Sequence, residues 1–131
     1  MKEVYDFIKK CGCYYLATLD SDGQPRVRPF GTILIFEDKL YIQTGKCKEV
    51  SKQIQKNPKV ELCCFDGTTW LRLSGELVRD DRIEPKKAML DDYPELKSMY
   101  SPTDDNTEVL YFTNAVATFS SFTQPPKVIK L

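Results

Sequence analysis

The hydrophobic positions near the start of the chain change from the period of a helix to that of a strand. Val4, Phe7, Ile8 and Cys11 are spaced at i, i+3, i+4 and i+7, which predicts a short amphipathic helix closed by a glycine. The following segment CYYLATLD (13–20) is almost continuously apolar or aromatic. That pattern is typical of a strand.

Two more strands are predicted directly after it. The turn SDGQ (21–24) leads into PRVRPFGTILIFED (25–38), a long strand whose middle is weakened by Pro29 and Gly31. A short turn then leads into LYIQT (40–44). Because only short turns separate the three strands, we expect them to form a meander.

The rest of the chain combines one clear helix with further strands. Cys47, Val50 and Ile54 share one helical face, lysines cover the rest of that segment, and Pro58 ends it. Strands are predicted over 60–66, 69–80 and 109–119, with a helical excursion over 83–100 that breaks at Pro94 and an unassigned tail over 120–131.

These elements predict one α+β, mainly β domain over residues 1–131. Six strands with a helix between the third and the fourth favour a barrel in a chain of this size. The edges that such a barrel leaves exposed favour a homodimer.

Charge and composition exclude several classes of protein. Lysine plus arginine number 19 and aspartate plus glutamate number 19, so the net charge is zero, which argues against nucleic acid as a partner. No apolar run is long enough for a membrane span, and the charged start lacks the apolar stretch of a signal peptide. We therefore expect a cytoplasmic protein that binds no membrane.

Five cysteines and no histidine limit the chemistry of the chain. An odd number of cysteines suits reduced thiols. The pairs CGC (11–13) and CC (63–64) lack the spacing of zinc ligands, so we expect buried thiols and no metal. Without histidine the commonest general base is missing. No catalytic residue is predicted, and a bound cofactor is the simplest source of reactivity.

Two arginines in the second strand form the first candidate site. Arg26 and Arg28 point to the same face of a strand, because side chains alternate, and Val27 points to the other. One interpretation is a solvated edge. The other is a fork of donors that holds an anion or an electron-rich ring.

The segment TGKCKEV (44–50) forms the second candidate. Thr44 ends a strand and Lys46 and Lys48 are predicted to lie in the first turn of the next helix, where positive charge opposes the helix dipole. Free N–H groups, a hydroxyl and two ammonium groups there would make a phosphate site. The alternative is a lysine-rich solvated helix.

The third candidate is TWLRLSG (69–75). Trp70 and Arg72 share one strand face with Ser74 and could stack on a flat ring. The alternative is an ordinary cross-strand aromatic pair beside a surface arginine. The aspartates are scattered and lack metal-loop spacing.

The order of RVRP, YIQTGKCK and TWLRLSG along residues 1–120 resembles the pyridoxamine 5'-phosphate oxidase-like FMN-binding split-barrel family. The small bacterial branch related to nitroimidazole-resistance reductases is the most similar. The resemblance implies a six-stranded split β-barrel and a homodimer with FMN at two sites between the subunits.

The resemblance also implies roles for particular residues. Arg26, Val27, Arg28 and Pro29 would line the isoalloxazine edge, Thr44, Lys46 and Lys48 would hold the phosphate, and Trp70 and Arg72 would approach from the neighbouring strand or the partner subunit. The tail lacks the arginine and histidine that read the substrate phosphate in pyridoxamine oxidases, which makes vitamin B6 an unsuitable substrate. The histidine associated with nitroimidazole reductases is also missing.

Three functions are compatible with these residues. The first is an FMN-dependent oxidoreductase that passes hydride or electrons from NADH or NADPH to a small acceptor. The second is a flavin-binding or redox-sensing module without turnover. The third is a small barrel that binds nucleic acid or protein through strand aromatics such as Tyr14, Tyr15 and Tyr41.

Overall fold

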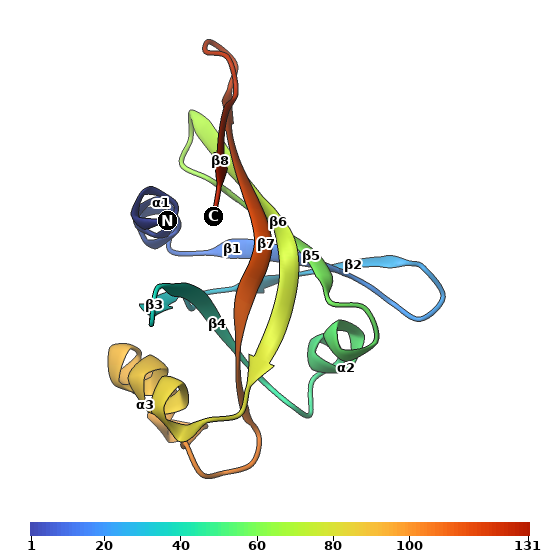
Figure 1. Ribbon diagram of the computed structural model, residues 1–131, viewed down its shortest axis with the longest axis vertical. Coiled ribbons are helices and arrows are strands. Elements are labelled where there is room, and N and C mark those ends of the chain that lie inside the picture. Colours follow the sequence, from blue (N-terminus) through green and yellow to red (C-terminus); the bar gives the residue numbers. More distant parts are fainter.

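One antiparallel sheet dominates the structure, a computed structural model that describes residues 1–131 (Figure 1). The strand order is β2-β1-β5-β6-β7-β4-β3, and β8 pairs with β7 beside this path. The strands are β1 (Tyr14–Leu19), β2 (Pro25–Phe30), β3 (Leu34–Phe36), β4 (Lys39–Gly45), β5 (Lys59–Phe65), β6 (Thr69–Asp80), β7 (Thr107–Ser121) and β8 (Lys127–Lys130). The predicted α+β, mainly β class is confirmed.

Helices flank the long β6–β7 pair. They are α1 (Lys2–Cys11), α2 (Glu49–Lys56) and α3 (Ile83–Asp92), which leads into the 3₁₀ helix η1 (Pro94–Ser98). Figure 1 shows α1 and α3 on one side of the β6–β7 pair and α2 on the other. The helical excursion predicted over 83–100 is thus confirmed, with its break at Tyr93 and Pro94. None of the helices combines the length and apolar character needed to cross a membrane.

Alternate side chains of the central strands build the core. Leu16, Leu62, Leu73 and Ala117 follow one another across β1, β5, β6 and β7, and all four are fully buried. Each large apolar side chain buried in this way contributes about 1.5–3 kcal/mol. The helices close the core with Val4 and Ile8 from α1 and Val50 and Ile54 from α2.

The long strand predicted over 25–38 is wrong, because the chain leaves the sheet between β2 and β3 at residues 31–33. Side chains there replace the backbone ladder. The N–H of Gln43 donates to the hydroxyl of Thr32 at 3.0 Å, and the carbonyl of Thr32 accepts a hydrogen bond of 2.7 Å from the hydroxyl of Tyr14. One predicted strand therefore becomes two.

The tail adds one more strand. Residues 127–130 pair with residues 116–119 of β7, and the ammonium group of Lys127 lies 2.8 Å from a carboxylate oxygen of Glu3 on α1. The structure therefore has eight strands instead of the six predicted. One additional strand results from the break after β2, and the other is β8, in a proline-rich segment that the sequence pattern left unassigned.

Candidate functional site

A cavity of about 640 Å³ lies where β2 and β4 end, beside the start of α2 and against η1. This volume is within the range of small-molecule sites, roughly 300–1,000 Å³. One wall is polar, with Arg28, Gln43, Thr44 and Lys48. The segment around η1 supplies further lining residues, namely Tyr93, Glu95, Leu96, Met99 and Tyr100.

Arg28 is a half-buried cation that no carboxylate neutralises. Its Nη1 donates to the carbonyl of Leu16 at 3.2 Å and to the hydroxyl of Thr18 at 2.8 Å. Its Nη2 donates to Oε1 of Gln53 at 2.7 Å. Burial, followed by the charge of Arg26, lowers the pKa of Arg28 from its ordinary value. An arginine stays protonated nonetheless, so positive charge is held at the cavity wall.

Lys48 is a second cation on the same wall. It immediately precedes α2, which begins at Glu49, so the predicted placement of Lys46 and Lys48 in the first helical turn was wrong. The ammonium groups of Lys46 and Lys52 pair with carboxylates, whereas that of Lys48 makes no ion pair. The N–H groups of Glu49 and Val50 also have no acceptor within the chain, as expected in a first helical turn.

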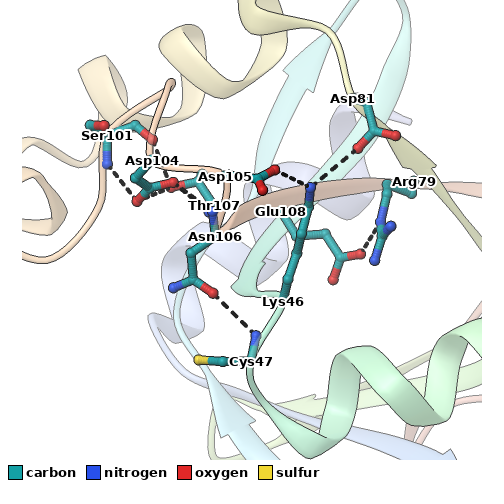
Figure 2. Close-up of polar contacts among 10 residues, drawn as sticks. All are labelled: Lys46, Cys47, Arg79, Asp81, Ser101, Asp104, Asp105, Asn106, Thr107 and Glu108. Carbon is teal, nitrogen blue, oxygen red and sulfur yellow. Dashed lines mark hydrogen bonds and ion pairs between the residues drawn. The ribbon is translucent and has the colours of Figure 1, made fainter.

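Lys46 points away from the cavity. Its ammonium group lies 3.2 Å from a carboxylate oxygen of Asp105 and 3.9 Å from one of Asp81. Figure 2 shows this side chain reaching toward the two aspartates, beside the pair of Arg79 with the buried Glu108. In this chain the charge of Lys46 is therefore already compensated.

A loop before β7 fixes the turn that carries Lys48. Asn106 accepts a hydrogen bond from the N–H of Lys46 through its carbonyl, at 2.7 Å. Its Oδ1 accepts a second one from the N–H of Cys47, at 3.1 Å (Figure 2). A side chain at Gly45 would place Cβ 3.1 Å from the hydroxyl of Tyr100 and 3.2 Å from Nδ2 of Asn106. A larger residue would therefore press on the side chains of Tyr100 and Asn106, and the N–H groups of Lys46 and Cys47 are already used within the chain.

Asp104 organises the same loop. It accepts hydrogen bonds from the N–H groups of Ser101, Asn106 and Thr107, at 3.0, 2.9 and 2.8 Å. Burial raises the pKa of Asp104, but these backbone hydrogen bonds outweigh that effect and hold the pKa at about 2. The carboxylate stays charged at neutral pH, and the loop that supports the Lys48 turn keeps its shape.

Arg26 lies outside the cavity. Its Nε is 3.1 Å from Oδ2 of Asp20 at the tip of the β1–β2 hairpin, so its charge is locally compensated. Val27 follows it on the opposite face of β2 and is 66% exposed. Of the predicted RVRP segment, only Arg28 and Pro29 line the cavity.

The strand register places Trp70 and Arg72 on the other face of the sheet. Pro29 faces Tyr15, Tyr15 faces Cys63, and Cys63 faces Arg72, and cross-strand partners share one face. Arg28 belongs instead to the row of Leu16 and Leu62. Neither Trp70 nor Arg72 lines the cavity of Arg28. The Trp70 ring packs 5.2 Å from that of Phe122.

Comparisons with known proteins identify the family of the chain. A family model described as pyridoxamine 5'-phosphate oxidase matches residues 1–120. The chain belongs to the pyridoxamine 5'-phosphate oxidase family. No match was found among the curated proteins.

Solved structures extend the family assignment. A NimC/NimA family protein from Clostridium acetobutylicum is 45% identical, with a TM-score of 0.95 over 100% of this chain and 92% of that one. A pyridoxamine 5'-phosphate oxidase-related, FMN binding protein from Nostoc punctiforme is 18% identical, with a TM-score of 0.64 over 98% and 91%. A heme binding protein from Mycobacterium smegmatis is 14% identical, with a TM-score of 0.70 over 94% and 57%. The split-barrel fold predicted from the sequence is confirmed.

The sequence did not predict that residues 93–100 would form part of the cavity wall. Tyr93 is fixed by its hydroxyl, which accepts from the N–H of Ile33 at 3.1 Å and donates to the carbonyl of Ile33 at 3.2 Å. Nothing in the local pattern indicates this contact, since it joins positions 60 residues apart. The local pattern also gives no sign that Gln43 lines the cavity, because its strand has the apolar pattern of an ordinary core strand.

Proposed function

We propose that the chain binds FMN in the cavity lined by Arg28, Thr44 and Lys48 and acts as an FMN-dependent oxidoreductase. The observation that carries this proposal is that Arg28 and Lys48 stand on one wall of a 640 Å³ cavity with no carboxylate partner. Two uncompensated cations beside a ligand-sized cavity fit an anionic, phosphorylated ligand.

The residues present fit the two ends of FMN. Lys48, the hydroxyl of Thr44 and the free N–H groups of Glu49 and Val50 offer donors for the phosphate at the start of α2. Arg28 and the backbone around Pro29 would face the polar edge of the isoalloxazine. When bound, FMN supplies hydride and electron transfer. The protein supplies binding, orientation and positive charge.

Three residues predicted to contact FMN do not line the cavity of a single chain, namely Arg26, Val27 and Lys46. Lys46 would have to exchange its aspartate partners for the phosphate. Because solvent-exposed ion pairs contribute only about 0–1 kcal/mol, such an exchange is inexpensive. We therefore propose Lys46 as a secondary contact of the phosphate and Lys48 as the main one.

We further propose that the site is completed in a homodimer. The outer face of β1, β2, β5 and β6 exposes several large apolar side chains, namely Tyr15, Val27 and Phe65, with Phe122 86% exposed at the end of β7. Trp70 and Arg72 lie on this same face. Because neither lines the cavity of its own chain, a contact with FMN would come from the partner subunit.

We expect reduced nicotinamide, NADH or NADPH, as the donor and a small molecule as the acceptor. No side chain of the cavity is assigned a proton-transfer role. The cytoplasm is the expected location, because the five cysteines form no disulfide and a reducing compartment preserves thiols.

The absorption spectrum of the purified protein tests the proposal. We expect the flavin bands of bound FMN, or their appearance after incubation with excess FMN. A protein that stays colourless, or that shows the Soret band of heme, would overturn it. Steady-state assays with NADH or NADPH then separate an enzyme from a flavin-binding module, since an enzyme bleaches and reoxidises rapidly while a module does not turn over.

A further inference from the structure

Gln53 on α2 lies at the centre of the hydrogen bonds that hold Arg28. Its side chain is buried, and its Oε1 accepts from Nη2 of Arg28 at 2.7 Å and from the hydroxyl of Thr18 at 2.6 Å. The hydroxyl of Thr18 in turn accepts from Nη1 of Arg28 at 2.8 Å. Gln53 therefore orients the guanidinium both directly and through a buried threonine.

The acceptors of Arg28 share one property, which is that none carries a charge. They are the carbonyl of Leu16, the hydroxyl of Thr18 and the amide oxygen of Gln53. A glutamate at position 53 would have nearly the same shape and could pair with Arg28, which is the usual arrangement for a half-buried guanidinium. The amide supplies the same geometry and leaves the charge uncompensated.

Arg28 also keeps donors for a ligand. A guanidinium has about five N–H groups, and the three hydrogen bonds above use Nη1 twice and Nη2 once. Nε and the second hydrogen of Nη2 remain without acceptors in the chain. Arg28 thus offers the cavity both free donors and charge.

We propose that Gln53 is a positioning residue that holds Arg28 at the cavity wall with its positive charge uncompensated, so that the cavity selects an anionic group. The identity of that group rests on the proposed function. It is either the phosphate of FMN or the anionic ring of reduced FMN, and both present the same chemistry to Arg28.

The test compares Gln53→Glu with Gln55→Glu in the full chain. Gln55 lies on the same helix and is exposed, so the second variant adds the same charge without reaching Arg28. We expect the Kd for FMN to rise about 10-fold or more in Gln53→Glu, the scale of a charged hydrogen bond, or the flavin midpoint potential to fall. Gln55→Glu should stay within about 2-fold of the parent, because exposed charges are screened.

Riboflavin distinguishes the two sources of the anion. If Arg28 meets the phosphate, Gln53→Glu weakens FMN but not riboflavin, which lacks the phosphate. If Arg28 meets the reduced ring, the midpoint potential falls equally with both flavins. Should Gln53→Glu match Gln55→Glu in both Kd and potential, the inference is overturned.

A neutral variant separates charge from packing. Gln53→Met removes the acceptor but adds no charge, and Leu16 and Thr18 still hold Nη1. We expect the FMN Kd to rise by less than about 10-fold, because Arg28 and Thr18 lose their shared acceptor while the charge of Arg28 stays uncompensated. A rise of about 10-fold or more would overturn the inference. This criterion compares Gln53→Met with the parent, so it also applies if thermal unfolding shows that Gln53→Glu does not fold.

The inference can fail separately from the proposed function. If the parent protein binds no flavin, the proposed function fails. Inorganic phosphate then becomes the probe, with the arginine Nε–H signals in NMR spectra of the full chain as the readout. Weaker phosphate binding in Gln53→Glu than in Gln55→Glu would support the anion site, and equal binding in the two variants would overturn it.

Discussion

Tyr41 on β4 donates a hydrogen bond of 2.7 Å to Oδ2 of Asp80 at the end of β6. Arg82 donates to the same carboxylate from Nη2 at 2.8 Å and from Nε at 3.0 Å, and its Nη2 also reaches Glu37 at 2.6 Å. Glu37 lies in the turn between β3 and β4. The network therefore ties the β3–β4 hairpin to the strand that leads into α3 and the cavity wall.

Substituting Asp80 by asparagine should destabilise the protein in a pH-dependent way. The hydrogen bonds from Arg82 lower the pKa of Asp80 from 3.8 to about 2. A lowered carboxyl pKa stabilises the fold above the unfolded-state pKa, and that stabilisation is lost as the pH falls through the folded-state pKa. The shift corresponds to about 2 kcal/mol. We expect urea unfolding to show this deficit for Asp80→Asn at pH 7 and a progressively smaller one between pH 4 and pH 2.

The matched control for this prediction is Asp38→Asn. Asp38 is exposed and makes no ion pair, so its substitution should leave the free energy of unfolding within about 0.5 kcal/mol of the parent at every pH. A deficit of Asp80→Asn that is constant from pH 7 to pH 2 would contradict the assignment to the Asp80 carboxylate.

Lys48→Ala should weaken FMN binding by about 1–3 kcal/mol, the range of a hydrogen bond to a charged group. Lys48 lines the cavity without an ion pair, so the loss should appear in the Kd from fluorescence titration and leave the unfolding midpoint unchanged. Lys52→Ala is the control, because Lys52 lies on the helix that follows Lys48 and pairs with Glu49. Equal effects of the two substitutions would place the phosphate elsewhere.

The sequence predicted the parts of the site that depend on local pattern. Arg28 follows from strand alternation, Pro29 from the family resemblance, and Thr44 and Lys48 from a strand that ends before a helix. It could not separate Lys46 from Lys48, because two lysines two residues apart in a turn have no fixed direction until the turn is built. The hydrogen bonds of Asn106 to that turn, made across the sheet, decide which lysine faces the cavity.

The same limit applies to the fold. Periodicity located the helices and the long strands, since burial imposes a repeat on them. It indicated a weakened middle at Pro29 and Gly31 but not the full break at Thr32, where a side chain takes over the role of the backbone ladder. It also could not place Trp70 and Arg72 relative to Arg28. Alternation gives the faces of one strand only, and the register across β1 and β5 is needed to compare β2 with β6.

Val27→Asp should convert the proposed homodimer into a monomer. Val27 is 66% exposed on the outer face of β2, and a carboxylate buried there between two subunits would lack a partner, which is costly. Light scattering at micromolar concentration should give the mass of one chain for this variant and of two for the parent. Ile83→Asp is the control, because Ile83 is an exposed apolar residue at the start of α3, away from that face. A monomeric parent would contradict the shared site.

Tyr93→Phe should loosen the wall of the cavity. The hydroxyl of Tyr93 accepts from the ammonium group of Lys9 at 3.1 Å and joins both backbone groups of Ile33, and its hydrogen bond raises the pKa of Lys9. Removing it leaves the N–H of the buried Ile33 without an acceptor, at a cost of about 1–3 kcal/mol. Urea unfolding should show this loss, whereas Tyr5→Phe, whose hydroxyl makes no hydrogen bond within the chain, should change the free energy of unfolding by less than about 0.5 kcal/mol.

The Tyr93→Phe substitution should affect the binding of FMN and of the acceptor differently. The hydrogen bonds that hold Arg28 and the Lys48 turn do not involve Tyr93, so the Kd for FMN should change by less than about 3-fold in the Tyr93→Phe variant. We propose that the acceptor binds beside Glu95, Leu96 and Met99, which line the cavity from the segment that Tyr93 anchors. We therefore expect the KM for the acceptor to rise more than the Kd for FMN. A variant that loses FMN without a change in acceptor KM would instead place the flavin against η1.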